Sequence, residues 1–275
     1  MNPHSIKEVA PPEKQAEILR DQGNLYFKKE RLGAAIEAYT EAITLCPRVP
    51  VYWTNRALCH RKRNAWDLVE ADCRKALELD NSLTKAHYML GLALLQGKQY
   101  GNAISELEKA FDLGRTGKSG SYMVEEIWQE LAKAHYTEWE QAASVRQHQQ
   151  QELKEAQLLA NQRKMSELSK HNEEYQERLQ TLSDIFEKAT VRDTPAEVPD
   201  HFCCKITMDL FRDPVITPSG VTYERSALME HLQKVGNFDP LTRAPLTPEQ
   251  VFPNLALKEA VQAFLAEHRW AYQTY

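Results

Sequence analysis

The sequence lacks the long apolar stretches that a membrane anchor or a secretory signal requires. Hydrophobic residues make up 42% of the 275 positions, but the longest apolar runs, such as 92–95, fall far short of the roughly 20 residues that span a bilayer. The first residues, MNPHSIKEVAPPEK, contain no apolar segment of the kind found in a signal peptide. We therefore expect a cytosolic or nuclear protein without a membrane span.

Cysteines are few, and their spacing does not suit a metal site. The five are Cys46, Cys59, Cys73, Cys203 and Cys204, and no two are separated by two residues. A single adjacent pair cannot supply the four ligands of a tetrahedral zinc site. A disulfide framework is typical of small secreted chains rather than of a reduced compartment. We expect neither a metal nor another cofactor.

An excess of one charge is also missing. The net charge is −5, and 27% of the residues are charged. This balance does not favour a nucleic acid or an anionic membrane as a partner, so any anion-binding surface must be local. The length allows two domains and a connector.

The sequence does contain a repeat of 34 residues. Gly23, Ala57 and Gly91 are each 34 apart, and two further tracks keep the same register, namely Ala35, Val69 and Ala103, and Ala42, Ala76 and Ala110. Small residues at fixed positions let two helices approach closely. The pattern resembles the tetratricopeptide repeat (TPR), a helix-turn-helix unit. Three copies cover 16–117, after a flexible N-terminus at 1–15, and such units stack into a superhelix with a concave face.

Polar residues on the first helix of each repeat can converge on the concave face. Arg20 and Asn24 are i and i+4 on one helix and share a face, and Asn55 and Lys85 take the first helices of the next two repeats. The set resembles the dicarboxylate clamp of chaperone-binding TPR domains, which implies binding of an Hsp70 or Hsp90 tail ending in Glu-Glu-Val-Asp. Charge-assisted hydrogen bonds suit such a ligand. Arg20 departs from the lysine that the family commonly has.

The same resemblance implies two further residues of this groove. Tyr88, one turn after Lys85, would pack against an apolar side chain of the peptide, and Glu126 would lie at the rim. The alternative is a generic scaffold whose polar helix faces are simply solvated.

The segment 118–190 is predicted to be a helical connector. From 122 to 188 it has neither proline nor glycine and is rich in helix formers. Apolar residues follow a heptad with Asn172 among them: Leu158, Met165, Leu179 and Phe186 at one position, and Leu168, Tyr175 and Leu182 at its partner. Such a seam must be covered by another helix. We expect a helical hairpin or a coiled coil, and a single solvated spacer helix is the alternative.

The last part of the chain, 195–270, is predicted to be a small α+β domain. Two β-branched runs flank Pro218-Ser219-Gly220 and indicate a hairpin. A helix with Leu228, Leu232 and Val235 on one face then ends at Gly236, and a last helix begins near Asn254. Without metal or disulfides, hydrogen bonds and salt bridges must hold the loops. The segments CKITMDLFRDPV, TPSGVTYER and FDPLTRAPL resemble the U-box, a RING-like fold without zinc found in E3 ubiquitin ligases.

The resemblance to the U-box implies a surface for a ubiquitin-conjugating enzyme (E2). Its residues are Ile206 and Met208 on a first loop, Phe238, Pro240 and Pro245 on a second, Arg243 as the residue that contacts both E2 and ubiquitin, and His231 as a support beneath. Met208 departs from the aromatic residue of some members. Cys203 and Cys204 have no base beside them, so the E2 cysteine would carry ubiquitin and catalysis would be by positioning.

Together these patterns predict a mainly α protein with a three-repeat TPR superhelix, a helical hairpin or coiled-coil connector and a small α+β U-box. The resemblance implies an E3 ubiquitin ligase and co-chaperone that transfers ubiquitin to chaperone-bound clients for proteasomal degradation. A non-enzymatic co-chaperone adaptor and a zinc-dependent RING enzyme are the alternatives, and the cysteine spacing disfavours the second. The E3 ubiquitin ligases that the chain resembles use the connector region to form a homodimer, so the resemblance implies a homodimer here.

Overall fold

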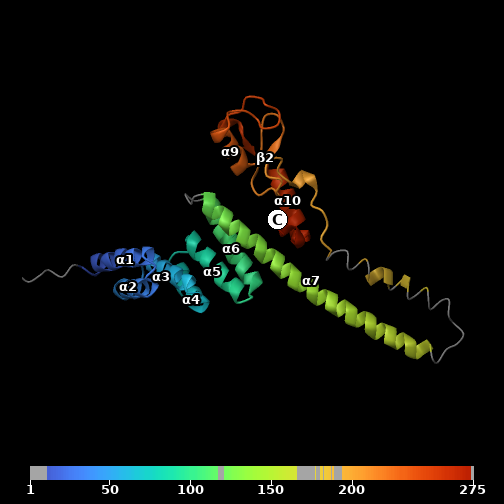
Figure 1. Ribbon diagram of the computed structural model, residues 1–275, viewed down its shortest axis with the longest axis horizontal. Coiled ribbons are helices and arrows are strands. Elements are labelled where there is room, and N and C mark those ends of the chain that lie inside the picture. The colour runs from blue at the N-terminus through green and yellow to red at the C-terminus, as the bar shows by residue number, and fades with distance from the viewer. Residues whose placement is uncertain are drawn as a thin grey trace, which may run out of the picture. The chain divides into compact units, whose positions relative to one another are not determined.

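The computed structural model describes residues 11–116, 121–165 and 194–273, together with 177, 180–181, 183–186 and 188. It divides into two compact units, Met1–Ala134 and His135–Tyr275. Helices dominate the first unit, and a small sheet with short helices makes up the end of the second (Figure 1). The predicted fold class, mainly α with a small α+β domain, is confirmed.

The first unit contains three helix hairpins in sequence. They are α1 (Pro12–Lys28) with α2 (Leu32–Leu45), α3 (Pro50–Lys62) with α4 (Trp66–Leu79), and α5 (Thr84–Gln96) with α6 (Tyr100–Thr116). Each helix packs against the next one along the chain from α1 to α6. This order of contacts is that of a stack of repeats in which each unit touches only its neighbours.

The 34-residue tracks lie where paired helices come closest. A Cβ added to Gly23 would lie 2.5 Å from Cε1 of Tyr39, and one added to Gly91 would lie 2.6 Å from Cγ of Leu107. Ala57, the residue between them in the track, is fully buried. The small residues are therefore required because the partner helix places a large side chain directly over the backbone.

The turn inside each hairpin repeats as well. Its central residue has a positive φ in all three repeats: Glu30 at 58°, Asn64 at 55° and Lys98 at 57°. The residue that follows donates its N–H to a carbonyl five residues earlier, in the pairs Arg31 to Tyr26, Ala65 to His60 and Gln99 to Leu94, at 2.9 to 3.0 Å. The three turns therefore share one left-handed helix cap.

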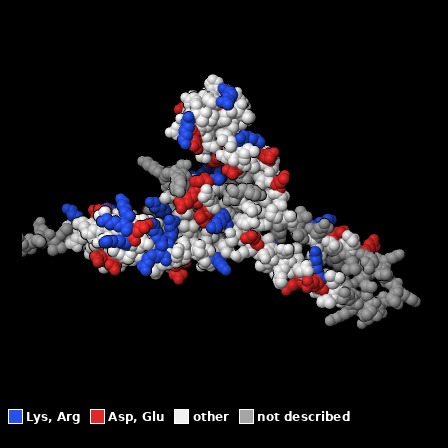
Figure 2. Space-filling model, viewed as in Figure 1, with Lys and Arg blue, Asp and Glu red and all other residues white. Residues whose placement is uncertain are grey.

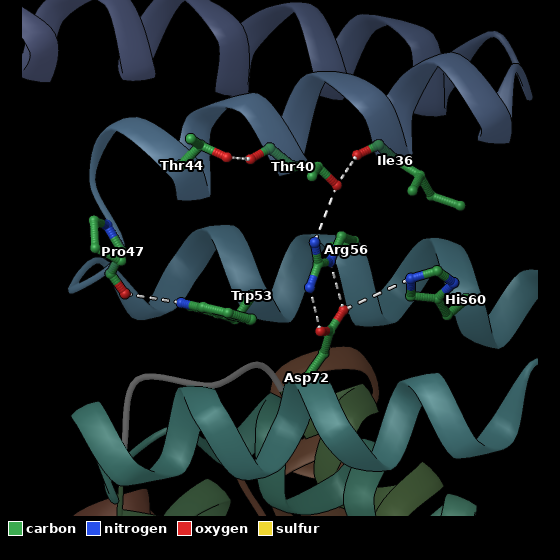
Figure 3. A network of polar contacts seen from close by, with 8 residues as sticks. All are labelled: Ile36, Thr40, Thr44, Pro47, Trp53, Arg56, His60 and Asp72. Carbon is green, nitrogen blue, oxygen red and sulfur yellow. Dashed lines mark hydrogen bonds and ion pairs between the residues drawn. The ribbon is translucent and has the colours of Figure 1, made fainter.

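A polar network ties the first two repeats together (Figure 3). Arg56 of α3 donates from Nε and Nη2 to the Asp72 carboxylate of α4, at 2.9 and 2.7 Å. Its Nη1 donates to Oγ1 of Thr40 on α2, at 3.0 Å. His60 lies 3.8 Å from the same carboxylate, and the Trp53 ring lies against the guanidinium. Because Asp72 is buried, this bidentate pair fixes the position of α3 between its neighbours.

Helix α7 (Ser121–Met165) begins as a cover for the third repeat. Ile127, Leu131 and Ala134 join a buried cluster with Tyr88 and Leu107. Farther along, four large apolar side chains are 56–57% exposed: Val145, Leu153, Leu158 and Leu159. The start of α7 is therefore a packed capping helix, while its second half leaves apolar surface uncovered.

The predicted heptad seam is described only in part. Leu158 is exposed, and the Lys154 ammonium lies 5.2 Å from the ring centre of Phe186. That contact brings the helical residues 183–186 beside α7. The heptad residues Leu168, Asn172, Tyr175, Leu179 and Leu182, and the side chain of Met165, lie outside the described residues. No helix in the described part of the chain combines the length and apolar character needed to cross a membrane.

The end of the second unit has a three-stranded antiparallel sheet. Its order is β2 (Thr222–Glu224), β1 (Pro214–Ile216) and β3 (Phe252–Pro253), and α9 (Arg225–Lys234) and α10 (Leu255–Glu267) complete it. Short 3-10 helices flank these elements: η1 (Asp200–Phe202), η2 (Pro248–Gln250) and η3 (Arg269–Tyr272). The predicted hairpin forms, with Thr217 N–H bonded to Val221 O at 3.0 Å and Gly220 at φ 80°.

The core of this domain lies between the sheet and the two helices. Val215, Tyr223, Leu228, Leu246 and Val261 are almost fully buried. The expectation that Val235 shares the buried face of α9 is wrong, since α9 ends at Lys234 and Val235 is 64% exposed. Asn254 caps α10 by accepting from the Leu257 N–H at 3.1 Å, as its residue type favours.

Candidate functional site

The first helices of the first two repeats, α1 and α3, bring two of the predicted clamp residues into contact. Asn24 Oδ1 accepts a hydrogen bond from Asn55 Nδ2 at 3.4 Å and a stronger one from the Tyr39 hydroxyl at 2.8 Å. Tyr39 is 2% exposed and comes from α2. Because the amide oxygen of Asn24 is engaged, its two N–H groups remain as donors for a ligand. The sequence did not predict this role of Tyr39. The available signal was a bulky residue on the second helix of the repeat whose first helix carries Gly23.

Arg20 lies one turn before Asn24 and is already engaged. Its Nε and Nη2 donate to Oδ1 of Asp21 at 3.1 and 3.0 Å. The hydrogen bond from Arg20 to Asp21 raises the pKa of the guanidinium above its ordinary value. A peptide carboxylate would have to compete with the exposed Asp21 for this cation, and exposed pairs of this kind exchange at little cost.

Lys85 stands in the first turn of α5 and is exposed. Within the described residues it forms no ion pair, so its ammonium is available to an anion. The structure records no direct contact between Lys85 and the Arg20, Asn24 and Asn55 side chains, so the basic ends of the predicted clamp remain separate groups.

Tyr88 and Glu126 are brought together on the same side of the third repeat. The Tyr88 hydroxyl donates to Glu126 Oε1 at 2.9 Å, which links α5 to α7. Burial, followed by the bond to Glu126, raises the pKa of Tyr88. Only 6% of Tyr88 is exposed, so its ring packs mainly into the core, and the Arg61 guanidinium lies 5.9 Å from its centre.

Two loops of the U-box region have the same backbone hydrogen bonds. In the first, Cys204 N–H donates to Asp209 O at 2.8 Å and Met208 N–H donates to Cys204 O at 2.9 Å. In the second, Asp239 N–H donates to Ala244 O at 2.8 Å and Arg243 N–H donates to Asp239 O at 2.9 Å. Each loop is therefore a closed turn whose fifth residue is held at one defined place.

The predicted E2-contacting side chains stand on these two turns. Met208 and Arg243 both have a positive φ, 62° and 61°, at the equivalent position of each turn. Met208 is 74% and Ile206 40% exposed. Met208 and Arg243 therefore hold a left-handed backbone conformation, which is uncommon for residues other than glycine.

The second loop is supported from beneath by His231. Its Nε2 lies 3.0 Å from Phe238 O, and the two rings meet edge to face at 5.0 Å. The Arg243 guanidinium lies 4.9 Å from the centre of the Phe238 ring. Pro245 pairs with Phe238 across the loop, and Pro240 between them is half-buried. The predicted residues His231, Phe238, Pro240, Arg243 and Pro245 thus form one group.

Asp239 holds the second loop to the sheet. Its carboxylate accepts hydrogen bonds from Thr217 at 3.0 Å, Ser219 at 2.6 Å and the Tyr223 hydroxyl at 2.7 Å, and from the N–H groups of Leu241 and Thr242. Burial by itself would raise the pKa of Asp239, but these hydrogen bonds outweigh it and hold the pKa well below the ordinary value. Sequence reasoning missed this residue as a support of the site.

Glu224 and Arg225 hold the end of the first loop in a similar way. The Glu224 carboxylate accepts from the N–H groups of Arg212 and Asp213 at 2.9 and 3.1 Å. Burial raises the pKa of Glu224, against the effect of these two bonds. Arg225 Nε pairs with Asp213 Oδ2 at 2.7 Å. The prediction that hydrogen bonds and salt bridges fasten these loops is confirmed.

The two cysteines of this domain are poorly suited to attack a substrate. Cys204 is 1% exposed, and its sulfur accepts the N–H groups of Ile206 and Glu224 at 3.4 and 3.2 Å. Burial is the main cause of the raised pKa of Cys203. A thiol with a raised pKa carries little thiolate, the reactive form. Within the described residues, no three His, Cys, Asp or Glu side chains gather around a metal position.

Comparisons with known families match both ends of the chain. The U-box domain matches residues 198–270. The tetratricopeptide repeat matches residues 16–49 and 84–114. These matches agree with the helix hairpins of the first unit and with the loop-rich sheet domain of the second.

One relative matches almost the whole chain. The Arabidopsis thaliana protein "E3 ubiquitin-protein ligase CHIP" is 55% identical over 266 residues, which cover 94% of this chain and 96% of that protein. The mouse "Ubiquitin conjugation factor E4 A" is 39% identical over 94 residues, 34% of this chain but 9% of that protein. Among solved structures, the "TPR2B-domain:pHsp70-complex of yeast Sti1" has 32% identity and a TM-score of 0.42, covering 44% of this chain and 96% of that chain. From its repeats, its U-box and the extent of the first match, the chain belongs to the CHIP family of E3 ubiquitin-protein ligases.

Proposed function

We propose that this ubiquitin ligase selects its substrates through chaperones. The TPR groove binds the acidic C-terminal tail of Hsp70 or Hsp90, and the U-box holds an E2 charged with ubiquitin. The observation that supports chaperone binding is the Tyr39–Asn24–Asn55 contact, which places amides from two repeats side by side. The non-enzymatic adaptor is not needed to explain a chain that belongs to a ligase family.

The groove suits a ligand with two neighbouring carboxylates. A C-terminal Asp carries both a main-chain and a side-chain carboxylate, and charge-assisted hydrogen bonds to them are about twice as strong as neutral ones. Arg20 supplies one cation after exchange with Asp21, Lys85 supplies another, and the Asn24 and Asn55 amides can hold the peptide backbone between them. Tyr88 and Glu126 would limit the groove on the side of α7.

The U-box would act by positioning. The E2 rests on the two turns, with Ile206 and Met208 from one and Phe238, Pro240 and Pro245 from the other. Arg243, already lying on Phe238, donates to both E2 and ubiquitin. The lysine amine of the client attacks the thioester on the E2, the C–N bond of the isopeptide forms, the C–S bond breaks, and the E2 thiol leaves. Holding both reactants together replaces a bimolecular encounter by an intramolecular one.

The exposed apolar residues of α7 support a homodimer. Val145, Leu153, Leu158 and Leu159 stay uncovered, and surface of this kind on a long helix is usually an interface. A second copy would cover it and place two U-boxes and two grooves in one assembly. Such an assembly would act on clients in the cytosol or nucleus and direct them to the proteasome.

One reconstitution tests the proposal. E1, several E2s, ubiquitin, ATP and a client-loaded Hsp70 are combined with the full chain, and the same Hsp70 lacking its last four residues serves as the matched control. We expect ubiquitin on the client only with the intact tail, and self-ubiquitination with both. Equal client modification with the truncated chaperone would refute tail capture, and no discharge from any E2 would refute the ligase half.

A further inference from the structure

The turns of the three TPR hairpins carry a group of cations without carboxylate partners. They are Lys28, Lys29, Arg31, Arg63 and Lys98, all exposed, and we call them the turn-edge cations. Within the described residues none of the five has an ion pair, whereas the nearby Lys62 lies 3.7 Å from Glu30. Figure 2 shows Lys and Arg gathered over the part of the first unit that contains α1 and α3.

The fold fixes these cations along one edge. Each turn has the same left-handed residue, Glu30, Asn64 or Lys98, so the 34-residue repeat places equivalent positions side by side. The first two turns are also in direct contact, because the Lys62 ammonium lies 5.0 Å from the centre of the Phe27 ring. The repeat therefore holds the turns that carry these cations in one fixed order.

Helix capping accounts for only part of this charge. Cations near a helix C-terminus are stabilised by the macrodipole, which suits Lys28 and Lys29 at the end of α1 and Arg63 at the end of α3. Arg31 is the N-cap of α2, a helix N-terminus where the dipole disfavours a cation. Lys98 follows Gly97, the C-cap of α5, and lies two residues before α6. Glu30 also lies in these turns, but its carboxylate is near Lys62. The macrodipole therefore does not explain the cation at Arg31.

The edge lies close to the proposed tail groove. Asn24 and Lys28 are four residues apart on α1, about 6 Å along the axis, and Asn55 and Arg63 are eight apart on or just after α3, about 12 Å. An extended peptide covers about 3.3 Å per residue. A peptide whose C-terminus occupies the groove can therefore reach the edge within about four residues.

We propose that the turn-edge cations form a second subsite for the same ligand, one that binds Asp-, Glu- or phosphate-bearing residues upstream of the C-terminal carboxylate. The inference rests on the proposed tail binding and adds a charge preference for the segment that precedes the tail. A protein ligand is favoured over a nucleic acid or a membrane because the same three helices carry the carboxylate-binding residues. The chain as a whole, moreover, has a net charge of −5.

Matched peptides test the second subsite. Two fluorescent peptides share the ending Glu-Glu-Val-Asp and differ in the four preceding residues, which are all Glu in one and all Gln in the other. We measure Kd by anisotropy with the full chain, with the triple variant Lys29→Gln/Arg63→Gln/Lys98→Gln, and with a control that removes cations elsewhere, Lys75→Gln/Lys109→Gln. Lys75 and Lys109 lie within α4 and α6, and both pair with carboxylates.

We expect the Glu peptide to bind the parent about three- to tenfold more tightly than the Gln peptide at low salt, since each exposed ion pair adds only a small gain and several act together. The advantage should persist in the control, fall to less than half in the triple variant, which keeps Lys28 and Arg31, and shrink at high salt. An equal Kd for the two peptides in the parent, or an unchanged advantage in the triple variant, overturns the subsite.

Two further measurements distinguish failure of the second subsite from failure of the proposed tail binding. If neither peptide binds the parent, or a C-terminal amide binds as well as the free acid, the proposed tail binding itself fails. A single-stranded RNA oligomer and vesicles with anionic lipid are offered to the same proteins. If the triple variant loses either of these ligands while the peptide advantage is unchanged, the edge serves a different partner and the proposal is wrong.

Discussion

Cys204 and Asp239 occupy the same position in two turns that share one hydrogen-bond pattern. Each residue donates its N–H to the carbonyl five residues ahead, at 2.8 Å, and accepts at its own carbonyl from the N–H four ahead, at 2.9 Å. Each side chain also accepts the N–H two residues ahead, through sulfur at 3.4 Å in Cys204 and through Oδ1 at 2.9 Å in Asp239. The two loops of this U-box thus share one turn structure, in which the side-chain acceptor is a sulfur atom in the first loop and a carboxylate oxygen in the second.

This equivalence would prepare the proposed E2 surface before an E2 arrives. The residue four positions after each anchor, Met208 or Arg243, is held with φ near 60°. The direction of its Cα–Cβ bond relative to the sheet is therefore fixed. A preorganised surface loses less entropy when it binds, so the anchors are expected to matter for activity although they need not touch the E2.

Substitution of Gly23 by Ala should destabilise the TPR unit. The new Cβ would lie 2.5 Å from the Tyr39 ring, which has no room to move between α1 and α2. Overpacking of this kind costs about 1–3 kcal/mol. Gly33→Ala is the matched control, since no atom lies within 4 Å of its added Cβ. Thermal unfolding should show a lower Tm for Gly23→Ala alone, and equal values for both variants would contradict the close approach.

The repeat and the U-box could be predicted because their signals are local and redundant. The three small-residue tracks identify the points where helices touch, as Gly23 against Tyr39 shows. The turn around Gly220 follows from residue type in the same way. Each of these features needs only neighbours in the chain or one repeat spacing to be recognised.

The supports of the sites could not be predicted, because they depend on long-range burial. The sequence FDPL marks Asp239 as a turn residue, but nothing local says that Thr217, Ser219 and Tyr223 will donate to it. The Tyr39 hydroxyl likewise depends on the crossing of two helices. Helix periodicity alone extends the buried face of α9 to Val235, but the helix ends at Lys234.

Replacing Tyr39 by Phe should weaken tail binding while the domain still folds. The ring and its packing remain, but the hydroxyl that holds the Asn24 amide oxygen is lost. The net value of one such hydrogen bond is about 1 kcal/mol, so Kd for a peptide ending in Asp should rise about fivefold. Tyr26→Phe is the control, because Tyr26 lies on α1 in the same repeat and is half-buried. The assignment fails if both variants bind like the parent.

Replacing Lys85 by Ala should abolish capture of the chaperone tail and spare self-ubiquitination. Lys85 is exposed on α5 and forms no ion pair within the described residues, so its loss should not disturb the fold. A charge-assisted contact removed from a ligand costs about 1.5–3 kcal/mol, which is at least tenfold in Kd. Lys109→Ala controls for net charge. Undiminished peptide binding by Lys85→Ala would remove it from the clamp.

Replacing Pro240 by Ala should have the reverse effect. Pro240 lies between Phe238 and Arg243 in the second turn and fixes the backbone there. Ubiquitin discharge from the E2 should slow by about tenfold or more, while the Kd for the tail peptide stays at the parent value. Pro248→Ala, in η2 outside the two turns, serves as the control. Full ligase activity of Pro240→Ala would contradict the proposed E2 surface.

Replacing Asp239 by Asn should loosen the second turn and change the pH dependence of stability. The amide keeps the shape, but with its oxygen facing Tyr223 and the backbone N–H groups it places a donor against the Thr217 and Ser219 hydroxyls, which should cost about 1–3 kcal/mol in unfolding free energy. E2 discharge should fall while tail binding is retained. Glu259→Gln, an exposed carboxylate on α10, is the control and should leave both unchanged.

The pH series then tests the charge of Asp239 directly. Because hydrogen bonds hold its native pKa below the unfolded value of about 4, the carboxylate stabilises the fold above that pH, and this contribution is lost as the pH falls toward the native pKa. The difference in Tm between parent and Asp239→Asn should therefore be constant from pH 7 to about pH 5 and shrink below pH 4. Taking the difference in Tm removes the contributions of other titrating groups, which are the same in both proteins. Glu224 is one such group, and its raised pKa changes stability with pH in the opposite direction. A difference that stays constant down to pH 3 would mean that Asp239 does not carry its charge in the folded U-box.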